Sequence, residues 1–440
     1  MKAVVLCGGV AKRMQPLRED KFALEFLGRP LLLHQVEMLR QAGLREFVFV
    51  ANGANVETVR GLVGSLSGAT CHFVQQEDAT GMAGAVEGAQ EYLDGPVLVV
   101  SSSDVVEDVA YSGVLRAAEQ VDAAALLLAY RVSQYFPGGY LVTDGGMDVR
   151  SIVEKPGCGS EPCDLVNVVV HFHRDGRKLL EAIAAVETER DDRYECALNL
   201  LVEEGQRVHA VPYGGFWGSL KYPWDVFAVM EHFLDRMKPS VAATARVAQS
   251  AVLEGNIVLG DGARVLENAV IRGPAYIGDG VVIGNNALIR GGAHIGAGSV
   301  VGYSTEVKHS YVGRDCWFHS NYIGDSIIDD GCSFGSGAVT ANLRLDGDGV
   351  QVLVDGERYD TGVEKLGVIM GRGCRLGINV SLMPGVRVGP GAFVGPHVCL
   401  TSDLGAGMKA MPLTGYEVTE GNGAAAGSGR DAPREKPEEA

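Results

Sequence analysis

Residues 277–301 read IGDGVVIGNNALIRGGAHIGAGSVV, with an aliphatic side chain at every sixth position. The same period extends over residues 241–307, and the residue four places after each aliphatic position is mostly Ala, otherwise Ile, Val, Ser, Thr or Tyr. A helix has no six-residue period, whereas one short strand per hexapeptide and three strands per coil build a triangular parallel β-helix. The aliphatic positions, which we expect to stack inside it, are Val241, Val247, Leu253, Leu259, Val265, Ile271, Ile277, Ile283, Ile289, Ile295, Val301 and Val307.

The period continues with one interruption. Around residues 308–335 the spacing slips, as expected where a coil has a five-residue side, and residues 340–367 break the pattern as an inserted loop. The repeat resumes at Met370, Leu376, Leu382, Val388 and Val394. We therefore expect a β-helix over 241–414. Residues 415–440 have almost no apolar side chains beyond Ala, which predicts a disordered tail.

Residues 1–225 have a different pattern, in which short apolar strands alternate with helices. Such alternation favours a Rossmann-like α/β domain with a mostly parallel sheet covered on both faces. A further helical segment, DVFAVMEHFLDRMK at 225–238, precedes Pro239 and predicts a linker helix at 226–240. The stretches that carry the alternation are AVVLCGG at 3–9, LLLHQVEMLRQAG at 31–43, EFVFVANG at 46–53 and PVLVVSSSD at 96–104.

Composition narrows the class of protein further. A chain of 440 residues predicts two or more domains, and a formal net charge of −17 argues against a nucleic-acid or membrane surface as the main partner. The nine cysteines are scattered and never spaced as CxxC, which favours reduced thiols in a cytoplasm over disulfides or a zinc site. The opening MKAVVLCGG is too short for a signal peptide and is read as a first strand.

This two-part arrangement resembles the bifunctional sugar-1-phosphate nucleotidylyltransferase/acetyltransferases. The bacterial members make UDP-N-acetylglucosamine, and the likeness is greater to the archaeal members. It covers about residues 1–405 and rests on the segments SNYIGDSII at 320–328, TANLRLDG at 340–347 and KLGVIMGRGCRLGINVSLMPGVRVG at 365–389. The resemblance implies a nucleotidyltransferase domain followed by a left-handed parallel β-helix of hexapeptide repeats with acyltransferase activity.

The resemblance assigns an acetyl-transfer site to the β-helix. His319 matches the general base that takes a proton from the sugar amine, a task that suits imidazole because its pKa lies near working pH. Lys308 and Tyr322 match residues that hold the sugar phosphate, Arg290 matches another phosphate contact, and Asn342 matches an Asn near the reacting amine. A surface histidine that caps a coil, and a solvated charge at Arg290, remain the alternative interpretations.

The same loop departs from the bacterial pattern. The bacterial proteins have a Lys about six residues after the matching Asn, where it meets the phosphates of acetyl-CoA. Here the segment is DGDG, with Asp348 in place of a cation. Arg344, Arg358 and Lys365 are possible substitutes, and the sequence leaves open how the phosphates of acetyl-CoA bind.

A Gly-rich loop follows the first predicted strand, in LCGGVAKRMQPLREDK at 6–21. Backbone N–H groups of such a loop and nearby basic side chains can cradle phosphates. In the resemblance, Gly8 and Gly9 match the loop, and Arg13 and Lys21 match its catalytic cations. The departures are Ala11 for a glycine, Lys12 for a threonine and Asp20 for a proline.

The resemblance also supplies the remaining nucleotide-site residues. Asp104, at the end of a strand, matches the Mg²⁺ ligand, a role that suits a carboxylate shared with substrate phosphates. The second metal position falls on Ser219, with Asp225 nearby either as a ligand or as a helix cap. Gln76 and Gly81 match the base-reading stretch, with Met82 in place of the usual threonine. The matches to sugar-binding positions are Gly139, Glu154, Lys155 and Asn167.

Taken together, the resemblance implies a cytoplasmic homotrimeric enzyme with two activities. One acetylates a hexosamine-1-phosphate with acetyl-CoA; the other transfers UMP or dTMP from UTP or dTTP to a sugar-1-phosphate with Mg²⁺. Two alternatives stay open. One is a non-catalytic subunit of the translation-initiation exchange-factor type, to which the altered loop and Ser219 point slightly and against which His319, Tyr322 and Asn342 count, because a scaffold needs none of them. The other is an acetyltransferase with a degenerate nucleotide-binding domain. The sequence fixes neither the nucleobase nor the choice between glucosamine and galactosamine.

Overall fold

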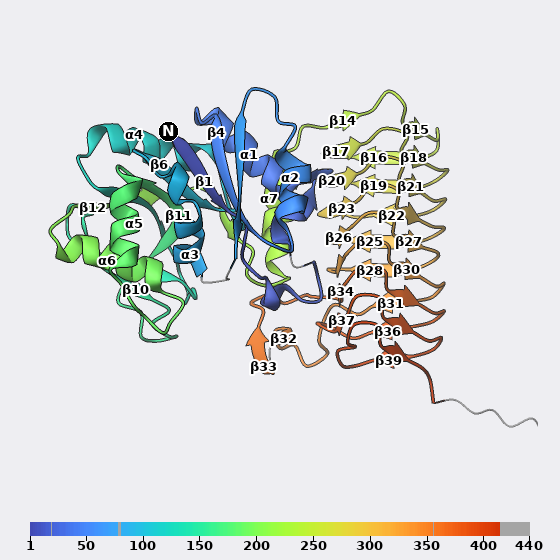
Figure 1. Ribbon diagram of the computed structural model, residues 1–440. Helices are drawn as coiled ribbons and strands as arrows, with labels where there is room; N and C mark the ends of the chain where they lie inside the picture. The colour runs from blue at the N-terminus through green and yellow to red at the C-terminus, as the bar shows by residue number, and fades with distance from the viewer. Residues whose placement is uncertain (19, 78–80, 355, 414–440) are drawn as a thin grey trace, which may run out of the picture.

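The computed structural model describes residues 1–18, 20–77, 81–354 and 356–413. The tail expected at 415–440 lies outside them. Figure 1 shows an α/β part and a β-helix side by side, with helix α7 (Asp225–Arg236) between them. This arrangement confirms the fold class predicted from the sequence.

The α/β part is built on one mixed sheet. Its parallel portion runs β6-β1-β4-β5, and β11 joins it antiparallel to β6 and continues to β9, β10 and β8. The sheet is therefore less uniformly parallel than expected, because β9, β10 and β11 turn back on one another. Its strands are β1 (Lys2–Leu6), β4 (Glu46–Asn52), β5 (Thr70–Gln76), β6 (Val97–Ser101), β8 (Ala125–Arg131), β9 (Gly139–Thr143), β10 (Val149–Glu154), β11 (Leu165–His173) and β12 (Val208–Tyr213).

Helices cover both faces of this sheet, as the alternating pattern predicts. Buried side chains of α1, α2 and α4 pack on one face, and those of α3, α5 and α6 pack on the other. Adjacent residues Val4 and Val5 of β1 point into opposite clusters, so the central strand is apolar throughout. The helices are α1 (Leu31–Gln41), α2 (Val56–Val63), α3 (Gly81–Gly88), α4 (Asp108–Gln120), α5 (Gly176–Ala184) and α6 (Arg193–Glu203).

The β-helix consists of parallel sheets that form its three sides, in the part of the chain that the structure describes. The first is β14 (Ser240–Val241), β17 (Ile257–Leu259), β20 (Ala275–Ile277), β23 (Ala293–Ile295), β26 (Tyr311–Val312), β29 (Ile327–Ile328), β34 (Ile369–Met370) and β37 (Arg387–Val388). The second is β15 (Arg246–Val247), β18 (Arg264–Val265), β21 (Val282–Ile283), β24 (Val300–Val301), β27 (Trp317–Phe318), β30 (Ser333–Phe334), β35 (Arg375–Leu376), β38 (Phe393–Val394) and β40 (Lys409–Ala410). The third is β16 (Val252–Glu254), β19 (Val270–Arg272), β22 (Leu288–Ile289), β25 (Glu306–Lys308), β28 (Tyr322–Gly324), β31 (Val339–Thr340), β36 (Ser381–Leu382) and β39 (Cys399–Leu400).

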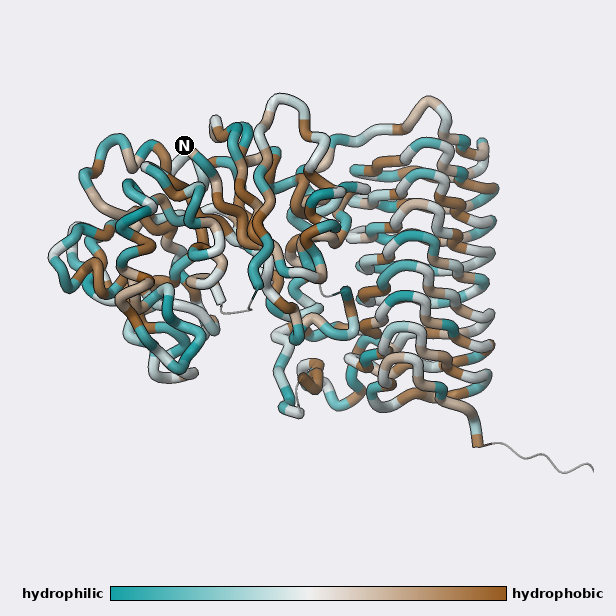
Figure 2. Tube along the Cα trace, in the orientation of Figure 1, coloured by the Kyte–Doolittle hydropathy of each residue, from teal (hydrophilic) through white to brown (hydrophobic). Residues whose placement is uncertain are grey.

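From Leu259 onward the predicted aliphatic positions form the inner column of the β-helix, whereas Val241 and Val247 in the first coil are exposed because no coil covers them from above. Ile277 pairs with Ile295 one coil later, and both are fully buried. Where the spacing slips, Val307, Val312, Phe318, Ile323 and Ile328 are all buried, so several sides there have five residues. In Figure 2 the coils alternate between hydrophobic and hydrophilic segments, as this inward and outward alternation requires.

The insertion at 340–367 contains a short antiparallel hairpin, β32 (Gln351–Val354) with β33 (Glu357–Asp360). The sequence indicated an insertion here but not its strands. Two further short pairs occur in the α/β part, namely β2 (Glu25–Phe26) with β3 (Arg29–Pro30) and β7 (Asp104–Val106) with β13 (Trp217–Ser219).

An apolar cluster joins the two parts. The outward residues of the first β-helix side include Tyr276, His294 and Tyr311, whose rings stack with centroids 4.9 Å apart. Phe26 packs against this stack, and the backbone N–H of Leu27 donates to His294 Nε2 at 3.2 Å. Because this outward column is aromatic instead of charged, it forms a surface on which α7 and the α/β part rest.

Candidate active sites

Two adjoining cavities open at the carboxyl ends of the parallel strands. The first, of about 610 Å³, is lined by Gly8, Gly9, Gln76 and Gly81 together with other residues. The second, of about 510 Å³, is lined by Arg13, Asp104, Gly139 and Asn167 among others. Both are also lined by Lys21, Glu154 and Lys155. The structure thus brings together every predicted nucleotide-site residue except Asp225.

Local geometry explains why residues 8 and 81 are glycines. A Cβ atom on Gly8 would lie 2.9 Å from Gln76 Oε1, so a side chain at residue 8 would displace the amide that faces it. Gly81 has a φ of 69°, in the left-handed region that favours glycine. Gln76 and Gly81 lie next to each other, with Gln76 Nε2 3.5 Å from the Gly81 carbonyl oxygen.

Cations surround Asp104 in the second cavity. Lys21 Nζ donates to the Leu220 carbonyl at 2.6 Å, and burial lowers the pKa of Lys21. Lys221 Nζ donates to the Pro137 carbonyl at 2.5 Å and lies 3.5 Å from the centroid of the Phe136 ring. Burial lowers the pKa of Lys221 to about 8. Sequence reasoning missed Lys221, whose only signal was its place two residues after Ser219.

Asp104 supplies carboxylate oxygens, which are the ligands that a hard cation such as Mg²⁺ prefers. The carboxylate is 8% exposed, and the Trp217 indole N–H donates to its Oδ1 at 3.1 Å. Ser219 pairs with Asp104 across β7 and β13, and both line the second cavity. Within the described residues no group of His, Cys, Asp and Glu could hold a metal by itself. The donors therefore suit a Mg²⁺ ion that takes its other ligands from water and substrate phosphates.

Asp225 lies in the first turn of α7, and its carboxylate binds the backbone of the loop that precedes the helix. Its Oδ2 accepts the N–H groups of Lys221 and Tyr222, each at 2.7 Å. Burial raises the pKa of Asp225 to about 6. Both N–H groups precede the helix, and α7 has no side-chain cap hydrogen bond, so Asp225 stabilises the turn before α7 and does not cap the helix. The metal site considered below therefore uses Asp104 without Asp225.

In the β-helix, Asp325 gathers two of the predicted acetyl-site residues. Lys308 Nζ donates to Asp325 Oδ2 at 2.9 Å, and Asn342 Nδ2 donates to the same oxygen and to the Tyr322 hydroxyl, the latter at 3.3 Å. Burial acts to raise the pKa of Asp325, but hydrogen bonds from His309, Lys308 and Asn342 outweigh it and hold that pKa below its usual value. Sequence reasoning did not single out Asp325, although it lies within SNYIGD.

The remaining predicted residues lie around this cluster. Arg290 follows β22, one coil before Lys308 on the third side, and its Nη1 donates to Glu306 at 3.0 Å. His319 follows β27 at the corner between the second and third sides and is exposed. Among the described residues, no hydrogen-bond partner of its imidazole was found. Arg344 is engaged by Asp346 in its own loop.

The fold and these two sites define a two-domain transferase, and comparisons with known proteins identify the class. The nucleotidyl transferase family model matches residues 2–220, and the bacterial transferase hexapeptide (six repeats) model matches residues 274–309 and 367–402. The bifunctional protein GlmU of Methanococcus maripaludis strain C7 is 34% identical over 92% of this chain and 95% of its own length. The chain therefore belongs to the bifunctional sugar-1-phosphate nucleotidylyltransferase/acetyltransferase family.

Two other relatives have the same coverage of this chain. The bifunctional protein GlmU of Methanocaldococcus jannaschii is 30% identical over 92% of this chain and 96% of the relative. A bifunctional sugar-1-phosphate nucleotidylyltransferase/acetyltransferase of Sulfurisphaera tokodaii is 28% identical over 92% and 99% of the two chains. These relatives confirm the resemblance and the bifunctional enzyme class. They give no better support to an exchange-factor subunit.

A search of the described helices for a membrane span found none of sufficient length and apolarity.

His309 joins α7 to the cluster around Asp325, and its hydrogen bonds predict that the free energy of unfolding depends on pH. His309 Nδ1 bonds Asp325 at 3.0 Å and its Nε2 bonds Glu231 of α7 at 2.6 Å, while Lys308 shares Asp325. These hydrogen bonds raise the pKa of His309 to about 9. The pKa of a histidine in an unfolded chain is about 6.5. The stabilisation is therefore complete below that pH and is lost as the pH rises through about 9.

Thermal unfolding measured between neutral and alkaline pH checks this expectation. The melting temperature of the wild type should fall more steeply with pH than that of His309→Gln. His397→Gln, at an exposed corner without a contact to α7, should keep the wild-type slope. Equal slopes for wild type and His309→Gln would contradict the assignment.

Proposed function

We propose that the N-terminal cavities catalyse transfer of UMP or dTMP from UTP or dTTP to a sugar-1-phosphate. The observation that carries this proposal is the convergence of Lys21, Lys221 and Asp104 on one cavity that also contains Glu154 and Asn167. Fixed cations beside a carboxylate suit a reaction in which negative charge moves between phosphate groups. The family relationship supports the same reaction class.

The residues have distinct parts in the proposed reaction. An oxygen of the sugar-1-phosphate attacks the α-phosphorus of the nucleoside triphosphate, and the bond to the β-phosphate breaks to release pyrophosphate. Gly8 and Gly9 approach the triphosphate, and Gln76 and Gly81 face the base. Arg13 and Lys21 offset charge on the transferred and leaving phosphates. Mg²⁺ held by Asp104 would supply further charge compensation when bound.

The sugar-1-phosphate occupies the second cavity in this proposal. Lys155, whose Nζ lies 2.9 Å from Glu154 Oε1, and Lys221 face its phosphate, while Gly139, Glu154 and Asn167 line the sugar. Lys221 adds a cation beside Ser219, the position at which the family resemblance places a second metal ligand. An acetyltransferase with a degenerate nucleotide domain remains the second candidate, because Ser219 lacks the charge of a carboxylate.

We further propose that the β-helix acetylates a hexosamine-1-phosphate, GlcN-1-P or GalN-1-P, with acetyl-CoA. The amine nitrogen attacks the thioester carbon, His319 takes the proton from the amine, and coenzyme A leaves. Lys308, Tyr322 and Arg290 bind the sugar phosphate, and Asn342 holds the sugar near the amine. Asp325 orients Lys308 and Asn342, and Lys308 keeps further N–H donors for a phosphate.

The assembly that completes this site is proposed to be a homotrimer. Among the described residues, no hydrogen bond joins the His319 imidazole to the Asp325 cluster. Two exposed aromatic side chains lie near His319 in the chain or in the coil before it: Trp317 is 56% and Tyr303 is 62% exposed. A second copy seated on this corner would cover these rings and supply the rest of the site. We place the enzyme in the cytoplasm, where both co-substrates are made and where its nine free cysteines stay reduced.

Light scattering tests the assembly. The wild type should be a trimer at micromolar concentration, and Trp317→Arg should dissociate it because a charge would be buried at the interface. Loss of acetyl transfer should accompany dissociation. A monomeric wild type would contradict the proposal.

Asp104→Ala tests the separation of the two sites. It should lower nucleotidyl transfer by about 10²-fold or more, because a carboxylate needed for charge compensation is lost, and leave acetyl transfer intact. Pyrophosphate release and coenzyme A release report the two reactions. Asp164→Ala, an exposed surface carboxylate, is the control and should keep both activities. Collapse of both activities in a folded Asp104→Ala protein would refute the separation.

His319→Ala and Lys308→Ala test the acetyl site as a pair. Loss of the general base should cut kcat for acetyl transfer by about 10²–10⁴-fold. Lys308→Ala should instead raise KM for glucosamine-1-phosphate more than it lowers kcat, because it removes a binding contact. Steady-state kinetics of acetyl transfer by the two variants measures these changes in kcat and KM. A His319→Ala enzyme that retains most of its kcat would leave the β-helix as a trimerising scaffold.

A further inference from the structure

The segment that carries Arg13 is tied to the β-helix by a buried ion pair. Arg18 Nη2 contacts Asp329 Oδ1 at 2.6 Å and Asp330 Oδ2 at 2.5 Å, across 311 and 312 residues of chain. The two aspartates follow strand β29 on the first side of the β-helix. No family role assigned above involves Arg18, and the contact becomes visible only in the folded chain.

Arg18 also reaches the turn that carries Lys21. Its Nη1 donates to the Ala23 carbonyl at 3.3 Å, and Lys21–Ala23 form a single 3-10 turn, η2. A second turn, η1 (Lys12–Met14), carries Arg13. The Arg18 guanidinium therefore connects Asp329 and Asp330 of the β-helix to the turn that carries Lys21. Along the chain, Arg18 lies four residues after the turn that carries Arg13.

Apolar contacts place the same segment on the β-helix. Met14 and Leu17 are buried in one cluster with Tyr311, Ile327 and Ile369 of the first side. The Pro16 carbonyl oxygen lies so close to Gly371 that a Cβ atom there would be 2.5 Å from it. The chain segment between the turns that carry Arg13 and Lys21 therefore packs on the surface of the β-helix.

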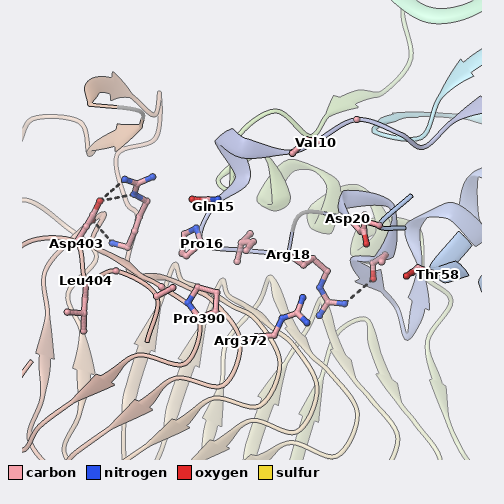
Figure 3. Close-up of a pocket in the computed structure, with 18 of the residues that line it drawn as sticks. Val10, Gln15, Pro16, Arg18, Asp20, Thr58, Arg372, Pro390, Asp403 and Leu404 are labelled. Atoms are coloured by element: carbon pink, nitrogen blue, oxygen red, sulfur yellow. Dashed lines mark hydrogen bonds and ion pairs between the residues drawn. The ribbon is translucent and has the colours of Figure 1, made fainter. Parts of the chain in front are cut away.

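Beside these contacts the segment borders a cavity of about 790 Å³. Figure 3 shows Val10, Gln15, Pro16 and Arg18 on one side of it, with Arg372, Pro390 and Leu404 of the β-helix on the other. Arg372 and Leu404 do not hold the segment through any hydrogen bond found among the described residues. Among the described residues, the hydrogen bonds found between residues 10–18 and the β-helix are those of Arg18 to Asp329 and Asp330.

Stability alone is a weak explanation for this ion pair. The Asp329 side chain is only 1% exposed and that of Arg18 17%, and removing such charges from water offsets most of their attraction. A paired arginine does, however, fix geometry, because its planar guanidinium binds in few orientations. A fixed backbone at Arg18 also fixes the directions in which the two flanking turns present their cations.

We infer that Arg18 is a positioning residue for nucleotidyl transfer, and that the Asp329–Asp330 pair of the β-helix holds Arg13 and Lys21 in place through it. This inference rests on the proposed nucleotidyl transfer. It makes the acetyl-transfer domain a structural part of the other active site. Catalysis at that site then depends on a contact between the two domains.

Arg18→Met tests the inference, with four readouts: the kcat and KM of nucleotidyl transfer, acetyl transfer, and UTP affinity by titration calorimetry. Misplacing the two cations should lower the kcat of nucleotidyl transfer by about 10- to 100-fold and weaken UTP binding. Acetyl transfer should stay within about twofold of the wild type, since residues on another side of the β-helix perform it. Arg18→Lys should recover part of the activity because it restores the charge without the planar fork.

Two further variants separate positioning from stability. Arg18→Met combined with Asp329→Asn removes the buried one of the two carboxylates that lose Arg18; the double variant should regain thermal stability but not kcat. Arg314→Met breaks another contact between the domains, an exposed pair with Glu25 at 3.3 Å, and should leave nucleotidyl transfer unchanged.

The outcomes distinguish this inference from the function on which it rests. A folded Arg18→Met enzyme with wild-type kcat, or full recovery of kcat in the double variant, would overturn the positioning role. A wild type that binds UTP but forms no nucleotide sugar would overturn the proposed function. In that case, unchanged UTP affinity in Arg18→Met would overturn the inference too, whereas weakened affinity would support it.

Discussion

The inward stacking of one aliphatic residue on the next, coil after coil, is the constraint on which the rest of this structure depends. Ile277 pairs with Ile295, and Ile283 with Val301, so the inner column has a single register along the axis. Because the column fixes register, every outward side chain has a determined place on one of three sides. The first side presents aromatic rings to α7, and the third presents polar residues that gather at Asp325.

This division of the surface explains how one chain holds two sites. The aromatic column of Tyr276, His294 and Tyr311 supports the α/β part, whose cavities open at the strand ends. The polar cluster lies on another side, linked to α7 through His309 and Glu231. The two domains are therefore joined by specific contacts as well as by the chain. Glu231 of α7 binds His309 beside the Asp325 cluster, and Arg18 binds Asp329 on the first side.

The sequence predicts most of this fold because the signals are local. A six-residue period and the alternation of apolar strands with helices both act within a few residues of the chain, and they predict the β-helix and the α/β sheet. The antiparallel strands β9 to β11 and the hairpin in the insertion were not predicted, since their pairing depends on tertiary contacts. Candidate site residues were found through resemblance, and the structure groups those of the nucleotide site around shared cavities.

The residues that sequence reasoning missed share one physical feature. Lys221 joins the cations near Asp104, Asp325 binds Lys308 and Asn342, and Arg18 binds Asp329, all through contacts that only the folded chain creates. A lone charged residue gives no signal of its partner in sequence, because most such residues are solvated. The departure at Ser219 was visible in the sequence, but nearness along the chain alone did not show that Lys221 lines the same cavity.

The most direct measurement is a product analysis of one purified preparation given glucosamine-1-phosphate, acetyl-CoA, UTP and Mg²⁺. The account predicts release of coenzyme A, followed by pyrophosphate and a UDP-linked N-acetylhexosamine, with galactosamine-1-phosphate and dTTP as parallel trials. Release of neither coenzyme A nor pyrophosphate from any of these combinations, by a folded trimer, would contradict the assignment of two active sites to this chain.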